Sequence, residues 1–312
     1  MKVKIERVAI IGAGLVGSGW AVVFAKAGYN VNVYDPQKEI RDRFLPWATE
    51  SASEFYKSGL APDPAIIINK LKICNTLEEA LHGVQYIQES VFERVDVKED
   101  VSLQIDALIG PQTIVGSSSS GIPASKFTEK CKHRENFLIV HPVNPPHLIP
   151  VVELVPAPWT NKELISQVRD FMTNVGQVPV VVNKEIDGFI LNRLQGVLLN
   201  EAWSLYEKGY ANLADIDATI SHGLGLRWSF MGPFETIDLN APKGITDYAE
   251  RLGGLYYKMA QQTVAAPWSK EAIKRADAER REALPLDQLR KRCEWRDKKL
   301  IELKAFKIKE GL

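Results

Sequence analysis

Cysteine is scarce in this sequence. Only three occur among 312 residues, Cys74, Cys131 and Cys293, and they lie far apart without the Cys-x-x-Cys spacing of zinc ligands. Their odd number and wide separation argue against a disulfide framework, and they indicate no metal site. We interpret them as reduced thiols, which is typical of a cytoplasmic protein.

An excess of charge of either sign is also absent. Lysine plus arginine and aspartate plus glutamate number 39 each, so the formal net charge at pH 7 is zero. Without a basic field, the chain is not expected to bind nucleic acid or an anionic membrane surface. A small molecule is the expected partner.

No apolar run is long enough to span a membrane. The first one, at 8–11, ends in glycines, so neither a signal peptide nor an anchor is expected. With 45% hydrophobic and 25% charged residues, the composition is still that of an ordered globular protein. A chain of 312 residues exceeds the usual size of one hydrophobic core, which favours two domains.

Short apolar runs alternate with helix-like stretches in the first part of the chain, a pattern typical of a doubly wound, Rossmann-like sheet. The predicted strands are 8–11, 31–34, 84–88, 113–115, 137–140, 151–155 and 178–182. After Asn183 the pattern is helical, beginning with a long helix from Gly188 to about Lys208 and ending in a charged stretch interpreted as a solvated helical face. The sequence therefore predicts an α/β domain over residues 1–185 and an all-α domain over residues 186–312.

The first predicted strand runs into a glycine-rich turn. Gly12, Gly14 and Gly17 have the G-x-G-x-x-G spacing, directly after a strand and directly before a helix. Gly12 would permit the tight turn, Gly14 would let the backbone approach a pyrophosphate, and Gly17 would let the helix pack on the strand. Leu15 and Val16 belong to the same predicted cofactor-binding turn, whose helix N-terminus faces the phosphates.

Asp35 ends the second predicted strand, eighteen residues after Gly17. A carboxylate there can accept hydrogen bonds from adenosine ribose hydroxyls and would repel a 2′-phosphate. This favours NAD over NADP, although Lys38 and Arg41 lie near enough to leave the preference open. The alternative, a glycine-rich turn without a ligand, is disfavoured by the order of strand, glycines, helix, strand and acid.

A second constellation follows the predicted strand at 137–140. His141 stands at its end, a proline-rich connection follows, and Glu153 lies within the next apolar run. A buried carboxylate is costly unless it is paired, so we expect His141 as its partner if the two runs lie side by side. Such a pair could take a hydroxyl proton while hydride leaves for nicotinamide. The alternative is a histidine and a glutamate with purely structural hydrogen bonds at a strand end.

The chain resembles the 3-hydroxyacyl-CoA dehydrogenase superfamily, and within it the lambda-crystallin branch. The shared motifs are I-V-H-P-V-N-P-P at 139–146, P-x-V-E-L-V-P at 150–156, K-E-I-D-G-F-I-L-N-R-L-Q at 184–195, G-L-G-L-R-W-S-F-M-G-P-F-E-T at 223–236 and L-N-A at 239–241. They are spread over nearly the whole chain. The resemblance implies that His141 is the catalytic base and that Glu153 is the acid paired with it.

The resemblance also implies roles for four further residues. Ser120 falls where the family has a serine that hydrogen-bonds the reacting oxygen, and Asn192 where an asparagine contacts substrate. Glu93 and Lys98 fall where family members contact the ribose and nicotinamide side of NAD. Each has an alternative interpretation: turn hydrogen bonds for the serine, helix capping for the asparagine, and a solvated helix pair for the last two.

The superfamily acts on CoA thioesters or on free hydroxy acids. Residues 36–72, where the thioester enzymes carry an extension that helps to hold CoA, have six basic and five acidic residues here and show no evident polyphosphate patch. Arg227 matches an arginine of the lambda-crystallin pattern and could bind a free carboxylate, although it could equally be an arginine at a helix end. We therefore expect oxidation of a free 3-hydroxy acid, such as L-gulonate, to the 3-keto acid.

Three alternatives stay open. One is an L-3-hydroxyacyl-CoA substrate. Another is a carnitine-type substrate, which would need an aromatic cage; Trp203, Trp228 and Phe230 are candidates by type, although core or interface positions are more typical of them. A third is a non-catalytic, crystallin-like structural protein, which the presence of every reacting residue disfavours. The resemblance finally implies a homodimer that pairs through its helical domains.

Overall fold

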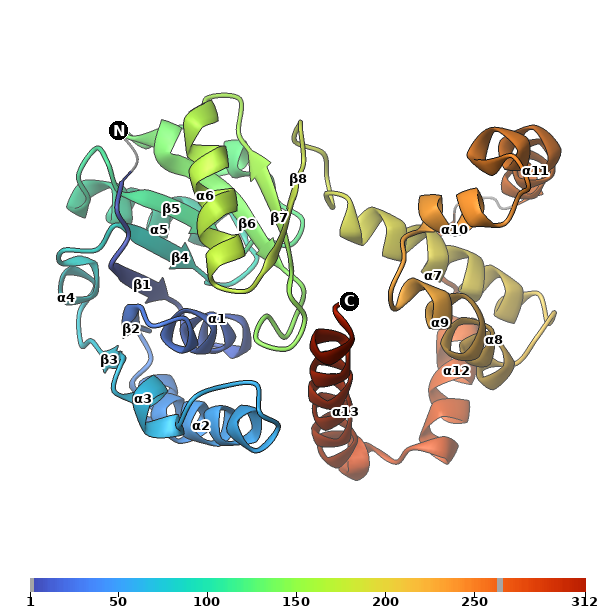
Figure 1. The fold of residues 1–312 in the computed structure, drawn as a ribbon, viewed down its shortest axis with the longest axis horizontal. Coiled ribbons are helices and arrows are strands. Elements are labelled where there is room, and N and C mark those ends of the chain that lie inside the picture. The colour runs from blue at the N-terminus through green and yellow to red at the C-terminus, as the bar shows by residue number, and fades with distance from the viewer. Residues whose placement is uncertain (1–2, 263–265) are drawn as a thin grey trace. The chain divides into compact units, whose positions relative to one another are not determined.

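The structure, a computed structural model, describes residues 3–262 and 266–312. The chain forms two compact units (Figure 1). The first comprises the described residues up to Arg193 together with Arg296–Gly311, and the second comprises the described residues of Leu194–Trp295 together with Leu312. The sheet lies in the first unit, so this unit positions the predicted cofactor turn and the predicted histidine and glutamate pair.

One eight-stranded sheet organises the first unit, in the order β3-β2-β1-β4-β5-β6-β7-β8. All neighbouring strands run parallel except β6 and β7, which are antiparallel. The strands are β1 (Arg7–Ile11), β2 (Asn30–Tyr34), β3 (Leu71–Ile73), β4 (Tyr86–Glu89), β5 (Ile114–Ser117), β6 (Phe137–Pro142), β7 (Val151–Pro156) and β8 (Val178–Val181). The predicted Rossmann-like fold class is confirmed. Strand β3 is not among the strands predicted from the sequence, because three residues are too few to show a periodicity.

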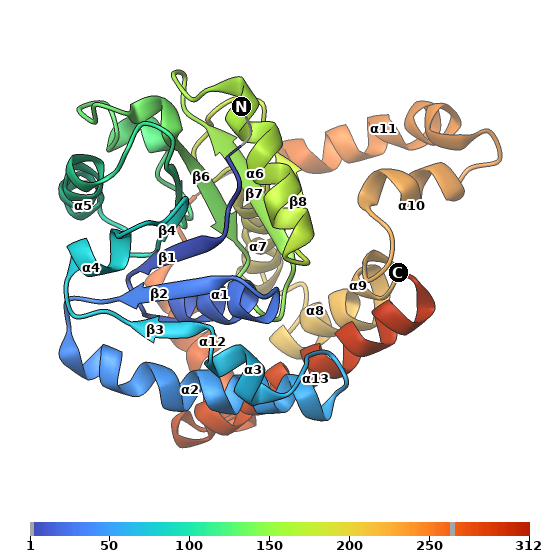
Figure 2. The same cartoon turned by 60° about the vertical axis from the view of Figure 1, so that its left-hand side comes forward.

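Helices cover both faces of this sheet, as a mostly parallel sheet requires. In β1, Val8 and Ile10 enter one hydrophobic core, while Ala9 and Ile11 enter another on the opposite face. Helices α1 and α6 supply the first core and α4 and α5 the second, and Figure 2 shows the two pairs on opposite sides of the strands. The helices of this part are α1 (Leu15–Lys26), α2 (Lys38–Lys57), α3 (Pro64–Ile68), α4 (Leu77–Leu81), α5 (Val95–Leu108) and α6 (Lys162–Asn174).

An aromatic cluster fixes α1 against the sheet. Trp20 and Phe24, one turn apart on α1, stack with ring centroids 5.3 Å apart, and Phe24 stacks in turn on Phe171 of α6 at 5.4 Å. Tyr86 of β4 packs against Phe171 at 4.8 Å. Each fully buried aromatic ring contributes about 1.5–3 kcal/mol through apolar burial. The packing therefore holds α1, and with it the helix N-terminus that follows the glycine turn.

The described residues after β8 form helices joined by loops, with no further strand among them. The helices are α7 (Leu191–Glu207), α8 (Leu213–Thr219), α9 (Gly225–Trp228), α10 (Pro233–Leu239), α11 (Gly244–Gln262), α12 (Lys270–Ala283) and α13 (Leu289–Glu310), with a π-helical turn at Ile220–Leu224. Helix α7 begins later than predicted because Gly188 and Phe189 have positive φ angles of 74° and 50°. No helix among the described residues has both the length and the apolarity to cross a membrane.

Candidate functional site

The glycine turn is closed by backbone contacts at two of its three glycines. Gly12 has φ +93°, and a Cβ there would lie 2.6 Å from the carbonyl oxygen of Ser90. A Cβ on Gly17 would lie 1.8 Å from the carbonyl oxygen of Gly12. A Cβ on Gly14 would meet nothing within 4 Å, and Gly14 is the N-cap residue of α1. The open position at a helix N-terminus fits a pyrophosphate, as the motif predicts.

The two residues between Gly14 and Gly17 have different surroundings. Leu15 is 73% exposed, whereas Val16 is half-buried against the hydrophobic core on the α1 side of the sheet. The side chain of Leu15 is therefore not packed in the core, whereas that of Val16 is.

Asp35 ties the glycine turn to the end of β2. Its Oδ2 accepts a hydrogen bond from the backbone N–H of Ala13 at 2.9 Å, and its Oδ1 accepts one from Gln37 at 2.9 Å. Arg41 donates from Nη1 to the carbonyl oxygens of Asp35 at 2.5 Å and Pro36 at 3.2 Å. Each carboxylate oxygen can accept more than one hydrogen bond, so these contacts leave Asp35 able to accept from ribose hydroxyls as well. The ribose contact itself stays a prediction.

The expected histidine and glutamate pair is present. His141 on β6 and Glu153 on β7 are register partners in the antiparallel pair, and His141 Nδ1 lies 2.8 Å from Glu153 Oε2. The two residues are 5% and 2% exposed. An ionised carboxylate has no proton to donate, so Nδ1 carries the shared proton and Nε2 keeps a free lone pair.

Glu153 has a second function in the fold. Its Oε1 accepts hydrogen bonds from the backbone N–H groups of Ile190 at 2.8 Å and Leu191 at 3.0 Å, where α7 begins. Burial raises the pKa of Glu153, but the hydrogen bonds from His141, Leu191 and Ile190 outweigh it, and the pKa is lowered overall. The buried ring of Phe189 packs 5.6 Å from the His141 ring. The segment that enters α7 is therefore attached to the pair.

Glu93 organises the loop that carries Ser120. Its Oε1 accepts hydrogen bonds from Ser119 Oγ at 2.8 Å, from the N–H groups of Ser120 and Gly121 at 2.8 and 3.0 Å, and from Ser120 Oγ at 3.3 Å. Asn192 Nδ2 donates to the carbonyl oxygen of Ser120 at 2.6 Å. Burial raises the pKa of Glu93, but the charge of Lys98 and these hydrogen bonds lower it overall. Three of the predicted site residues, Glu93, Ser120 and Asn192, are thus brought together.

Lys98 is not the solvated residue that one alternative suggested. It is 1% exposed, and its Nζ lies 3.0 and 3.2 Å from the two carboxylate oxygens of Glu89 at the end of β4. Sequence reasoning missed Glu89, and it also missed Gln88 and Ser118, whose side chains are joined by a 2.8 Å hydrogen bond. The available signal was a pair of polar residues closing an otherwise apolar strand. Arg227, the predicted carboxylate ligand, lies half-buried in α9 of the second unit.

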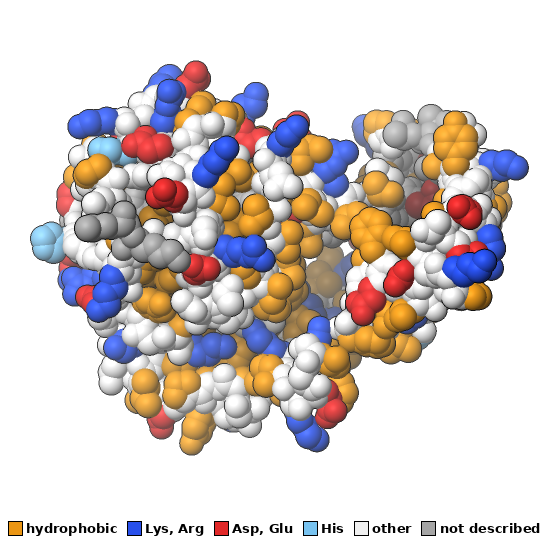
Figure 3. Space-filling view, turned by 45° about the horizontal axis from the view of Figure 1, so that its top comes forward, with side chains coloured by type: hydrophobic (Ala, Val, Ile, Leu, Met, Phe, Trp, Pro, Cys, Tyr) orange, Lys and Arg blue, Asp and Glu red, His pale blue; other side chains and the backbone are white. Residues whose placement is uncertain are grey.

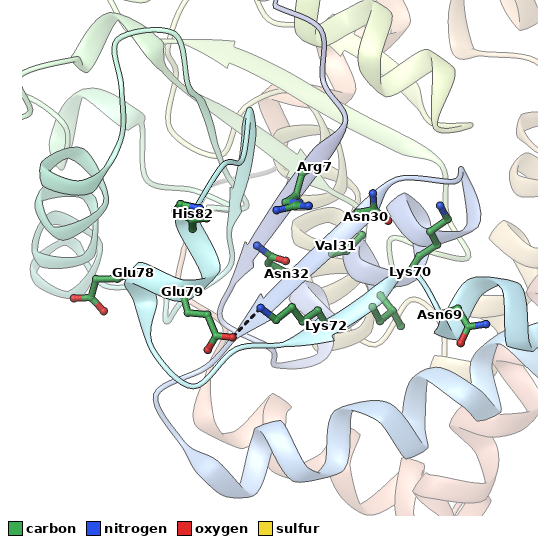
Figure 4. Close-up of a pocket in the computed structure, with 11 residues that line it drawn as sticks. Arg7, Asn30, Val31, Asn32, Asn69, Lys70, Lys72, Glu78, Glu79 and His82 are labelled. Atoms are coloured by element: carbon green, nitrogen blue, oxygen red, sulfur yellow. Dashed lines mark ion pairs between the residues drawn. The ribbon is translucent and has the colours of Figure 1, made fainter.

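A polar cavity of about 550 Å³ opens elsewhere, near the amino ends of β1, β2 and β3 (Figure 4). Arg7, Asn32 and Lys72 line it from the strands, and Lys72 pairs with Glu79 of α4 at 2.9 Å. None of the predicted site residues lines this cavity. Doubly wound sheets bind their ligands at the carboxyl ends of the strands, so we do not assign the cavity to the cofactor. Among the described residues, no cluster of three or more His, Cys, Asp or Glu could hold a metal ion.

A Rossmann-like sheet with this glycine turn is the architecture of a nicotinamide-dependent oxidoreductase. Residues 7–186 match the NAD binding domain of 3-hydroxyacyl-CoA dehydrogenase, and residues 188–282 match the C-terminal domain of the same enzyme. The chain belongs to the 3-hydroxyacyl-CoA dehydrogenase family. It is accordingly an NAD-dependent dehydrogenase, and the resemblance seen in the sequence is confirmed.

Individual relatives differ in what their names say they act on. The chain is 36% identical to lambda-crystallin of Oryctolagus cuniculus over 96% of both chains. It is 38% identical to L-carnitine dehydrogenase of Pseudomonas putida over 76% of this chain and 73% of the relative. A solved structure of 5-formyl-3-hydroxy-2-methylpyridine 4-carboxylic acid 5-dehydrogenase, an NAD⁺-dependent dismutase, matches with a TM-score of 0.86 and 26% identity over 99% of both chains.

Proposed function

We propose that the protein oxidises the hydroxyl group of a free 3-hydroxy acid, such as L-gulonate, to the 3-keto acid. The observation that supports this most is the buried contact of 2.8 Å between His141 Nδ1 and Glu153 Oε2. A histidine that must accept a proton during a reaction gains from an ionised partner, because the carboxylate stabilises the imidazolium.

The proposed roles of the pair follow from its geometry. With its proton on Nδ1, His141 presents the lone pair of Nε2 to the substrate hydroxyl and takes the proton there. Glu153 holds the ring in this tautomer, and its lowered pKa keeps it ionised at neutral pH. When NAD is bound, it supplies the acceptor for the hydride that leaves the carbon bearing this hydroxyl.

Ser120 and Asn192 are proposed to bind the reacting oxygen. The side chain of Asn192 is joined to the backbone of Ser120 by the 2.6 Å hydrogen bond from Asn192 Nδ2 to Ser120 O. This bond uses one of the two amide hydrogens of Asn192, so the other can reach substrate. Ser120 is exposed, and its hydroxyl can therefore reach a ligand.

The choice of a free acid rests on charge. Arg227 is proposed to bind the substrate carboxylate through its fork of donors. The match to a dehydrogenase named for a pyridine carboxylic acid supports this choice, because that compound carries a free carboxylate. A carnitine substrate is the second candidate, since the Pseudomonas putida relative acts on one. Of the aromatic candidates for its cage, Trp203 stacks on Trp268 at 5.0 Å, so one face of its ring is covered.

A homodimer is part of the proposal. Several large apolar side chains of the second unit are exposed, among them Val197, Phe234 and Tyr257, and hydrophobic side chains are visible at the surface in Figure 3. Exposed apolar surface of this kind is typical of an interface between subunits. Light scattering after size-exclusion chromatography should give twice the mass of the chain.

A substrate panel tests the proposed reaction. Protein and NAD are mixed in turn with L-gulonate, L-carnitine and L-3-hydroxybutyryl-CoA, and formation of NADH is followed by absorbance. We expect the highest kcat/KM for L-gulonate, the free acid without a quaternary ammonium. Preference for carnitine or for the thioester would replace the proposed substrate, and no turnover of any hydroxy acid would refute the reaction.

Two variants test the residue roles. His141→Ala should lower kcat by about 10²–10⁴-fold, since the general base is lost. Near-normal turnover by this variant would refute the assignment. Arg227→Met should raise KM for the free acid with little change in KM for NAD, whereas Arg251→Met, which alters a surface arginine of α11, should change neither. Equal KM values for the wild type and Arg227→Met would remove Arg227 from the site.

A further inference from the structure

A buried ion pair lies next to Glu93, the residue that binds the loop of Ser119, Ser120 and Gly121, called the serine loop below. The side chains of Glu89 on β4 and Lys98 on α5 are 2% and 1% exposed, and Lys98 Nζ lies 3.0 Å from Glu89 Oε1 and 3.2 Å from Oε2. Removing two charges from water is costly, and an apolar pair of similar size would often stabilise a fold equally well. We therefore expect the Glu89 and Lys98 charges to have a role other than stabilising the fold.

Glu89 is held from every side. Its Oε1 also accepts a hydrogen bond from the backbone N–H of Val91 at 2.6 Å, and its Oε2 accepts one from Ser117 Oγ at 2.5 Å. The carboxylate thus joins the ends of β4 and β5 to α5. These are the carboxyl ends of parallel strands, where doubly wound sheets bind their ligands.

The ammonium of Lys98 leads onward from Glu89 to the serine loop. Its Nζ lies 3.6 Å from Glu93 Oε2, the carboxylate oxygen that does not bind the loop. The other oxygen, Oε1, accepts the hydrogen bonds from Ser119, Ser120 and Gly121. A continuous series of contacts therefore runs from Glu89 through Lys98 and Glu93 to Ser120.

We propose that Glu89 is a positioning residue of the dehydrogenase site, which holds the Lys98 ammonium beside Glu93 and thereby fixes the Ser120 loop. Without the negative charge of Glu89, the ammonium has only Glu93 as an anionic partner and draws its carboxylate away from the loop. The inference rests on the proposed function, because Ser120 matters to catalysis only if it binds the reacting oxygen.

The first test measures the loop without any substrate. Amide hydrogen exchange is compared at Ser120 and Gly121, whose N–H groups are donated to Glu93, in the wild type and in Glu89→Gln. Faster exchange at both positions in the variant is expected. Unchanged exchange at both would overturn the proposal, whether or not the protein turns over a hydroxy acid.

The second test separates positioning from charge balance. Glu89→Gln alone leaves an ammonium buried without its main partner and can fail to fold, so the double variant Glu89→Gln, Lys98→Met removes both charges. The double variant should regain most of the wild-type Tm. In the absence of NAD and substrate, the amides of Ser120 and Gly121 should still exchange faster than in the wild type, because Glu93 has lost the ammonium that Glu89 holds beside it. Wild-type exchange at both amides in the double variant would show that Glu89 only balances charge and would overturn the proposal.

A control comes from a second buried carboxylate. Asp106 accepts hydrogen bonds from the N–H groups of Lys132 at 2.6 Å and His133 at 3.0 Å, away from the serine loop. Asp106→Asn should lower Tm and leave kcat/KM and the exchange at Ser120 unchanged. If exchange accelerates in Glu89→Gln while His141→Ala stays active, the positioning role stands and the proposed reaction fails.

Discussion

The two halves of the candidate site are built by different means. In the half predicted to bind the adenosine, the backbone N–H of Gly12 donates to the carbonyl oxygen of Tyr34 at 2.9 Å, and Asp35 accepts from the N–H of Ala13, 22 residues away. In the half proposed to bind substrate, carboxylates join segments that are somewhat further apart along the chain. Glu153 reaches Leu191, 38 residues away, and Glu93 reaches Gly121, 28 residues away.

The glycine turn is therefore expected to depend on steric fit, and the substrate half on charge. The glycine turn works because certain atoms are absent, so its failure should follow from adding a methyl group. The substrate half works because certain charges are present, so its failure should follow from removing a charge at constant volume. Variants that add volume in the glycine turn and variants that remove charge in the substrate half therefore test this difference.

The largest effect is expected at Gly17. The Cβ of Gly17→Ala would lie 1.8 Å from the carbonyl oxygen of Gly12, and backbone cannot yield as a side chain does. We expect a loss of at least about 3 kcal/mol in the free energy of unfolding, the upper range for overpacking. Thermal unfolding and NADH fluorescence titration should show a lowered Tm and lost binding.

Gly14→Ala is the matched control. Its Cβ meets no protein atom within 4 Å, so the Tm should change little while the affinity for NADH falls, because the methyl group stands where the pyrophosphate approaches. A wild-type Tm for Gly17→Ala, or unchanged NADH affinity for Gly14→Ala, would contradict the steric account of this half.

A smaller effect is expected from Glu153→Gln. The amide can still accept from Ile190 and Leu191, but it has no second acceptor for His141 Nδ1–H, so the tautomer and the imidazolium lose support. We expect kcat to fall about 10-fold to 100-fold, the size of loss typical when a carboxylate that orients a metal-bound histidine is removed. Steady-state kinetics beside Glu50→Gln, an exposed change on α2, provides the comparison.

The same variant should alter the pH dependence of stability. A carboxylate whose pKa is lowered by folding stabilises the protein above its unfolded pKa, about 4.3 for glutamate, and this stability is lost as pH falls through the lower folded pKa. The Tm of Glu153→Gln should therefore fall less than that of the wild type on acidification below about pH 5. An equal fall of Tm with pH in the wild type and in Glu153→Gln would show that the ionised carboxylate of Glu153 does not stabilise the folded protein.

The sequence was most informative where the requirement is local. The order of strand, glycines, helix, strand and acid predicted the turn, because each residue type answers a steric or hydrogen-bonding need within about 30 residues. The pairing of His141 with Glu153 could be expected only on the condition that two runs lie side by side, which the antiparallel register of β6 and β7 fulfils.

What escaped prediction depends on distant partners. Glu89 resembles any acid at a strand end until Lys98 and Ser117 are placed against it. Ile301 lies in a stretch that its charge marked as a solvated helical face, yet it is buried in the core on the α1 side of the sheet. A narrow apolar stripe in a highly charged helix gives too weak a periodicity to show which face is covered.

The smallest predicted effect concerns the connection between β6 and β7, which packs on α1 and so touches both halves. A Cβ on Gly19 of α1 would lie 2.9 Å from His147 Nδ1. Burial, followed by the charges of Lys304 and Lys26, lowers the pKa of His147 to about 4. Between this value and the unfolded value of about 6.5, the unfolded chain binds more protons, so stability falls as pH decreases through this window.

His147→Phe keeps an aromatic ring of similar size against Trp47 and Phe55 but cannot titrate. Between pH 7 and pH 5, the wild type should lose about 1 to 2 kcal/mol more unfolding free energy than this variant. Urea unfolding at the two pH values measures the difference, with His82→Gln, an exposed histidine of the first unit, as control. If the wild type and His147→Phe lose equal stability, His147 is protonated as easily in the folded protein as in the unfolded chain. Electrostatic control in the substrate half would then be limited to the carboxylates Glu93 and Glu153.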